Sequence, residues 1–154
     1  YMIDSLDKVA LTIGPNERTA VDDLLDIVEA VAGPALATVY LLHVFERDEY
    51  DELMERMGMD ATSGAIQPDE LAERHDGVQT PAKRLTEQGL DCEVRGTIGD
   101  PESEVVRVAE ELDIDLLFIG GGGRTPIKKA IFGNSAQQIL LNAPCPVTYV
   151  RRDR

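Results

Sequence analysis

The sequence predicts an α/β domain in which five parallel strands form an open sheet with helices on both faces. Segments that favour strands alternate with segments of helical periodicity, in the order β-α-β-α-β-α-β-α-β. The strand segments are continuous apolar runs, which is typical of parallel strands that are buried on both faces. A length of 154 residues suits one hydrophobic core, so we expect a single domain over residues 1–154.

The first half of the chain contains two of the expected strands. They cover residues 8–13 and 38–45, which are short apolar runs rich in residues that favour strands. Between them, apolar residues recur at helical spacing over residues 21–31, and Gly33-Pro34 is expected to end this helix. The polar segment 46–67 is expected to be mobile, with room for one short helix.

The second half supplies the other strands and helices. A helix is expected over residues 68–88, with a kink or break where Gly77 and Pro81 interrupt it. Asp100 and Pro101 predict the start of the next helix, because aspartate is a favoured N-cap and proline suits the first helical position. The remaining segments are strands over residues 91–98, 116–119 and 147–150 and a helix over residues 135–141.

The charge of the chain excludes two classes of partner. Acidic residues number 29 against 15 basic ones, so the formal net charge is -14. Such a surface repels both nucleic-acid phosphates and anionic membranes. No apolar run reaches the roughly 20 residues that span a bilayer, and no secretory signal is visible, so we expect a cytoplasmic location. The acidic bias indicates either an interaction surface or adaptation to high salt, and we favour a halophilic archaeal source.

Cysteine and histidine give little sign of a metal or redox site. Cys92 and Cys145 are not spaced as a metal-binding or redox pair, so no disulfide framework is expected. His43 lies within an expected strand and His75 on the apolar face of an expected helix, and both are interpreted as packing residues. With only these two histidines, neither a histidine-rich metal site nor a catalytic histidine is expected.

One segment carries the pattern of a phosphate-binding loop. Residues 120–135 read GGGGRTPIKKAIFGNS and follow directly on an expected buried strand. Glycines allow the backbone to approach phosphate oxygens, and a helix start presents unpaired N–H groups to an anion. Three of the fifteen basic residues lie in this segment. The spacing is neither a Walker loop nor a dinucleotide fingerprint; it is G-x2-G-x9-G, formed by Gly120, Gly123 and Gly133.

Together with shorter motifs, this spacing resembles the universal stress protein family over nearly the whole chain. The shorter motifs are Leu-Leu-His-Val at 41–44, Gly-Asp-Pro at 99–101, Gly-Asn-Ser-Ala-Gln at 133–137 and Ala-Pro-Cys-Pro-Val at 143–147. The resemblance implies a Rossmann-like fold of the adenine nucleotide α-hydrolase type with strand order 3-2-1-4-5. It also implies a homodimer through the last strand, from Val147 to Val150, which is otherwise an exposed sheet edge.

The resemblance further implies a site for an adenine nucleotide, ATP or ADP, with or without magnesium and with no covalently bound cofactor. Residues that match the family's contacts to adenine and ribose are Thr12, Ile13, Gly14, Val44 and Ile119. Those that match its contacts to phosphates and ribose are Gly120, Gly123, Gly133, Asn134 and Ser135, with Arg124 to screen their charge. Any hydrolysis is expected to be slow, because no positioned general base is found.

Two positions depart from the family's nucleotide-binding pattern. Gly14 stands where the family usually has an aspartate, which removes a polar contact worth roughly 1–3 kcal/mol. Asn134 replaces a serine or threonine, and it can also serve simply as the cap of the last helix. Two hypotheses therefore remain: a nucleotide-binding stress regulator, and a dimeric interaction module that has lost the nucleotide. A turnover enzyme is not favoured, because the S-G-G-x-D-S and H-x-G-H motifs of related enzymes are missing.

Overall fold

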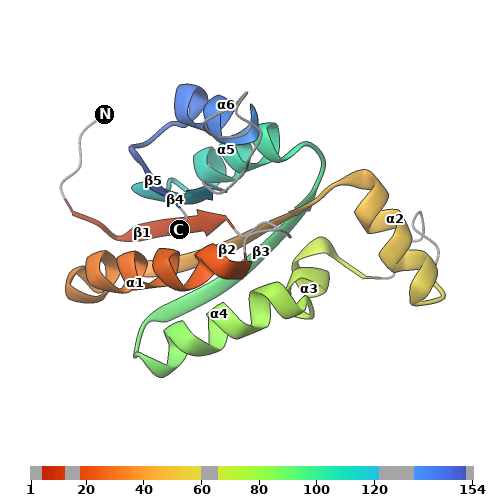
Figure 1. Ribbon diagram of the computed structural model, residues 1–154, viewed down its shortest axis with the longest axis horizontal. Helices are drawn as coiled ribbons and strands as arrows, with labels where there is room; N and C mark the ends of the chain where they lie inside the picture. The colour runs from red at the N-terminus through yellow and green to blue at the C-terminus, as the bar shows by residue number, and fades with distance from the viewer. Residues whose placement is uncertain (1–4, 13–17, 60–65, 122–133, 152–154) are drawn as a thin grey trace.

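The structure is a computed structural model that describes residues 5–12, 18–59, 66–121 and 134–151. Five strands pair in parallel in the order β3-β2-β1-β4-β5, which confirms the predicted fold class and strand order. Figure 1 shows this sheet between two groups of helices. The strands are β1 (Lys8–Thr12), β2 (Thr38–Phe45), β3 (Asp91–Ile98), β4 (Leu116–Gly121) and β5 (Val147–Arg151).

The helices of the described residues cover both faces of the sheet. They are α1 (Arg18–Ala35), α2 (Arg47–Arg56), α3 (Pro68–Glu73), α4 (Asp76–Glu87), α5 (Pro101–Glu111) and α6 (Asn134–Asn142). Helices α1 and α4 pack on one face, and α5 and α6 pack on the other (Figure 1). None of these helices combines the length and apolar character needed to cross a membrane.

Alternation along the strands divides the core into two layers. Val9 and Leu11 of β1 pack in the layer of α1 and α4, whereas Ala10 between them packs in the layer of α5 and α6. Both layers exclude water, since Val9 and Leu11 are fully buried and Ala10 is nearly so. This explains why β1, β2 and β4 read as largely apolar runs, because a strand covered on both faces needs apolar residues at every position. The same expectation is wrong for β3, an outer strand that contains Asp91, Glu93 and Arg95 and is exposed at alternate positions at its start.

The predicted end of the first helix at Gly33-Pro34 is wrong by two residues. Pro34 lies inside the last turn of α1. The chain turns instead at Leu36, whose φ of 57° places it in the left-handed region usually taken by glycine. The N–H of Ala37 then donates to the carbonyl of Ala32 at 3.1 Å, which closes the helix end.

The segment that follows β2 contains the short helix for which the prediction left room, since α2 occupies its first half. Tyr50 and Met54 of α2 are buried against Phe45 at the end of β2. This small apolar cluster extends the core beyond the sheet, so α2 is held by packing although its sequence is largely charged.

The single helix predicted over residues 68–88 is in fact two helices. The predicted break exists, but it falls at His75, before both Gly77 and Pro81. His75 is the N-cap of α4, and its Nδ1 accepts a hydrogen bond from the N–H of Gly77 at 3.0 Å. The expected place of His75 on the apolar stripe of a helix is therefore wrong, because the residue begins α4. Its expected packing role is confirmed, since its half-buried ring lies 4.4 Å from the ring of His43.

Helix α3 lies against β3, at the outer edge of the sheet. The N–H of Gly96 donates to the carboxylate of Asp69 at 2.7 Å. A Cβ atom placed on Gly96 would lie 2.2 Å from the carbonyl oxygen of Pro68. Only glycine allows this approach, and α3 thereby covers part of an edge that would otherwise offer unpaired backbone groups.

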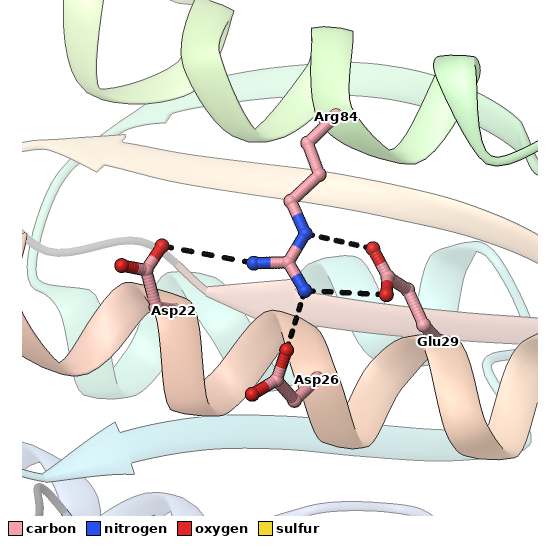
Figure 2. A network of polar contacts seen from close by, with 4 residues as sticks. All are labelled: Asp22, Asp26, Glu29 and Arg84. Carbon is pink, nitrogen blue, oxygen red and sulfur yellow. Dashed lines mark hydrogen bonds and ion pairs between the residues drawn. The ribbon is translucent and has the colours of Figure 1, made fainter.

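A charged cluster joins α1 to α4 (Figure 2). The guanidinium of Arg84 donates to both carboxylate oxygens of Glu29, at 2.8 and 3.2 Å, and also to Asp26. Asp22 lies 3.6 Å from the same group. The hydrogen bonds to Glu29 and, to a smaller extent, the one to Asp26 raise the pKa of Arg84 above its ordinary value. One cation thus pairs with three carboxylates on a single face of α1 and lowers their mutual repulsion.

Replacement of Gly96 by alanine is expected to lower the free energy of unfolding by roughly 1–3 kcal/mol, because the new methyl group overpacks against a backbone carbonyl. Urea denaturation measures the change. Gly33→Ala is the matched control, since no atom beyond its chain neighbours and its own helix backbone lies within 4 Å of its Cβ position. The preference of a helix for alanine over glycine is opposed there by the following Pro34, so the change in stability is expected to stay below roughly 0.5 kcal/mol. Equal effects of the two variants would contradict the close contact.

Replacement of Arg84 by glutamine is expected to lower the free energy of unfolding by about 1–2 kcal/mol at low salt, because three carboxylates then lose their shared cation. The loss should shrink in 1 M salt as the remaining repulsion is screened. Arg107→Gln is the control, since within the described part of the chain Arg107 pairs with Glu104 and Glu111 of its own helix and with no other carboxylate. Its effect is expected to stay below roughly 0.5 kcal/mol, and a larger loss than for Arg84 would refute the cluster's role.

Candidate functional site

Four of the predicted site residues lie along one edge of the sheet, namely the edge formed by the carboxyl ends of the strands. Thr12 ends β1, Val44 is the last residue but one of β2, and Ile119 and Gly120 belong to the second half of β4. Because all strands run in parallel, their carboxyl ends share this edge. Leu11 pairs with Phe118, so Thr12 and Ile119 lie side by side one step further along.

The same edge contains the topological switch point, where the connections between strands begin to run toward the opposite side of the sheet. From β1, the sheet continues through β2 and β3 on one side and through β4 and β5 on the other. In open α/β sheets, ligands bind outside the carboxyl ends of the strands at such a switch point, which here lies between β1 and β4. Since β4 ends at Gly121 and α6 begins at Asn134, the glycine-rich segment starts at this switch point.

Other residues of the predicted site are outside the described part of the chain. They are Ile13, Gly14, Gly123, Arg124 and Gly133. Asn134 and Ser135 form the first turn of α6, whose backbone N–H groups have no acceptor within the helix. The predicted helix over residues 135–141 is confirmed with one extra residue at each end.

The walls of this edge are apolar on the face covered by α5 and α6. Ile119 is 2% exposed, and Val44 is half-buried and packs against the same cluster. Apolar surroundings of this kind suit an aromatic base.

Thr97 is a polar residue near this site that the sequence analysis did not select. It pairs in register with Val44 and is 8% exposed. Within the described residues, its Oγ1 has no hydrogen-bond partner. Buried hydroxyl groups are usually paired, so Thr97 is a candidate for a contact that the described residues do not supply. The sequence alone does not distinguish Thr97 as a candidate site residue, because a single threonine in a strand is common.

The two helices on this face differ in the charge at their N-termini. Asp100 precedes α5, and Glu102 and Glu104 lie in its first turn, whereas the first turn of α6 has no acidic residue. Along the chain, residues 116–152 contain no aspartate or glutamate and five arginines or lysines. All acidic residues of the chain except Asp153 precede Leu116. The helix dipole therefore favours an anion at α6, while carboxylates oppose it at α5.

A second polar cluster lies at the end of β2, on the opposite face of the strand. His43 is fully buried, and its Nε2 lies 3.4 Å from Oε2 of Glu49 in α2. Nε2 of His75 lies 3.8 Å from the same oxygen, and the two imidazole rings are 4.4 Å apart. Burial lowers the pKa of His75, and His43 lowers it further, against the opposing effects of Glu49 and Asp76. The sequence interpretation treated these histidines as unconnected.

The cysteines are not reactive groups. Both are free thiols, as predicted. Burial, with a smaller contribution from a nearby carboxylate, raises the pKa of Cys92 and of Cys145 to about 11. At neutral pH both thiols stay protonated, so neither acts as a nucleophile.

Comparison with known proteins gives both a family and a fold. The sequence profile of the universal stress protein family matches residues 10–151. A universal stress protein of Methanocaldococcus jannaschii is 28% identical over 82 residues, which are 53% of this chain and 48% of that protein. The chain therefore spans about half the length of this relative.

Solved structures repeat the architecture at low identity. Another M. jannaschii protein superimposes with a TM-score of 0.74 at 22% identity, over 97% of this chain and 98% of that one. A universal stress protein of Archaeoglobus fulgidus in complex with dAMP has a TM-score of 0.64 at 17% identity, over 94% and 97% of the two chains. The fold and the matched profile agree, and the chain belongs to the universal stress protein family.

Proposed function

We propose that this protein is a regulator that binds an adenine nucleotide, ATP or ADP, at the carboxyl edge of the sheet. The observation that carries the proposal is the position of the glycine-rich segment. It leaves β4 at the switch point and leads to α6, within the one long stretch of the chain that lacks acidic residues. This stretch carries five basic residues and no acidic one, so it favours an anion more than the acidic remainder of the chain does.

In this proposal the base and ribose lie against the ends of β1, β2 and β4. Thr12, Val44 and Ile119 supply the described part of that surface, and Ile13 and Gly14 extend it. The phosphates lie on backbone N–H groups of the glycine-rich segment and of the first turn of α6. The contacting residues are Gly120, Gly123, Gly133, Asn134 and Ser135, with Arg124 as the counter-charge. Magnesium, when present, is carried by the phosphate oxygens.

The choice of an adenine nucleotide is supported by a relative. The A. fulgidus protein of the same fold was solved with dAMP. A regulatory role fits the side chains proposed for the site, because Thr12, Val44, Ile119 and Gly120 include no group that could act as a general base. Hydrolysis is accordingly expected to be slow, and occupancy of the site is the regulatory variable.

The proposal includes a homodimer formed through β5. Among the described residues this strand pairs with β4 alone, so its other side is a sheet edge. Pairing with a second copy would protect that edge from unspecific association. A cytoplasmic location is proposed as well, since the two free cysteines suit a reducing compartment.

Titration calorimetry with ATP and with ADP, in the presence of magnesium, tests the nucleotide proposal. The protein is expected to bind one nucleotide per chain. Gly123→Asp is expected to weaken binding at least 100-fold, because a carboxylate then stands where the phosphates should lie. Gly33→Asp, on α1, is the control for added charge and should leave the affinity unchanged.

Two results would overturn the proposal. No heat and no thermal shift of the wild-type protein at millimolar nucleotide would leave the dimeric interaction module, which the glycine at position 14 favours. Unchanged affinity of a folded Gly123→Asp variant would show that the glycine-rich segment does not hold the phosphates.

Thr97→Val tests the contact from β3. The change removes a buried hydroxyl that lacks a partner within the described residues, so the free protein should be as stable or slightly more stable. Nucleotide affinity should fall about five- to tenfold, the effect of one lost hydrogen bond. Thr38→Val is the matched control, because Thr38 lies at the opposite end of β2. Equal affinities of wild type and Thr97→Val would exclude Thr97 from the site.

A further inference from the structure

We propose that His43, Glu49 and His75 form a binding site for a divalent transition-metal ion of the zinc class. The three side chains come from β2, from α2 and from the turn between α3 and α4. One possible ligand atom from each lies within 4.8 Å of the other two, and no other such group occurs among the described residues. The site is on the face of β2 opposite Val44, so it is distinct from the proposed nucleotide site.

The distances suit a shared ion better than direct hydrogen bonds. Nε2 of His43 and Nε2 of His75 lie 3.4 and 3.8 Å from Oε2 of Glu49. Good N–H···O bonds span about 2.7–3.2 Å. In a tetrahedral zinc site with bonds of about 2.0–2.1 Å, neighbouring ligand atoms are roughly 3.3 Å apart. Small rotations of Glu49 and His75, which are both partly exposed, would complete this geometry.

The donor set indicates which ions fit. Two imidazoles and one carboxylate match zinc, cobalt and nickel, whereas magnesium and calcium prefer oxygen ligands alone. His43 is fully buried, while the side chains of Glu49 and His75 are 28% and 25% exposed. An ion therefore has a path from solvent, and water can complete its coordination.

Metal binding would alter one hydrogen bond at the start of α4. Nδ1 of His75 accepts the N–H of Gly77, which places the proton of the neutral ring on Nε2. Coordination through Nε2 moves that proton to Nδ1 and breaks the bond to Gly77. The site thus couples an ion to the N-terminal turn of α4 as well as to the positions of α2 and β2.

Titration of the metal-free full chain with Co²⁺, without nucleotide, tests the proposal. One ion per chain should produce the visible absorption of cobalt in a low-symmetry site with nitrogen ligands, and one equivalent of Zn²⁺ should abolish it. Hydrogen exchange at the amide of Gly77 should accelerate on binding, because its acceptor is lost. An absence of absorption, or binding without any change at Gly77, would overturn the proposed coordination.

Two variants and one control identify the ligands. His75→Asn removes the imidazole but keeps a good N-cap, and Glu49→Gln removes the charge at nearly constant shape. Each should weaken Zn²⁺ binding at least tenfold. Glu52→Gln, at an exposed position of α2, should leave it unchanged. Equal affinities across all variants would mean that surface carboxylates bind the ion, and would refute the site. Gly123→Asp should bind Co²⁺ normally, which separates this test from the nucleotide proposal.

Discussion

The parallel pairing of β1 with both β2 and β4 is the constraint on which the rest of the molecule depends. It brings the carboxyl ends of three strands to one edge and forces each connection to cross a face of the sheet through a helix. The two layers of helices then bury both faces, which requires apolar residues along the entire length of the central strands. Core and site therefore follow from the same pairing.

The central strands were predictable because burial on both faces requires continuous apolar runs, which are visible in the sequence. Helix ends were less so, since they depend on contacts that local sequence does not display. Leu36 takes the left-handed conformation that ends α1, although Gly33-Pro34 looked like the terminator. His75 begins α4 by accepting a backbone hydrogen bond, a role that its place on an apolar stripe concealed.

The candidate site was predictable where a sequence motif marks it, as in the glycine-rich segment and at the strand ends of Thr12, Val44 and Ile119. Glycine spacing marked the segment after β4, and the order of strands placed its start at the switch point. Thr97 is a candidate for the site because it pairs in register with Val44. This register is set by the pairing of two strands that are far apart in the sequence. His43, Glu49 and His75 come together only because α2 and α4 fold back onto β2. The spacing of these residues in the sequence does not predict that arrangement.

The uneven distribution of charge has a kinetic consequence. An anionic ligand that approaches a molecule of net charge -14 is repelled before it reaches the acid-free stretch over residues 116–152. Added salt shortens the range of this repulsion to about 10 Å at 0.1 M ionic strength. Encounter with an anion should therefore become faster as ionic strength rises, the reverse of the behaviour of proteins whose whole surface attracts their ligand.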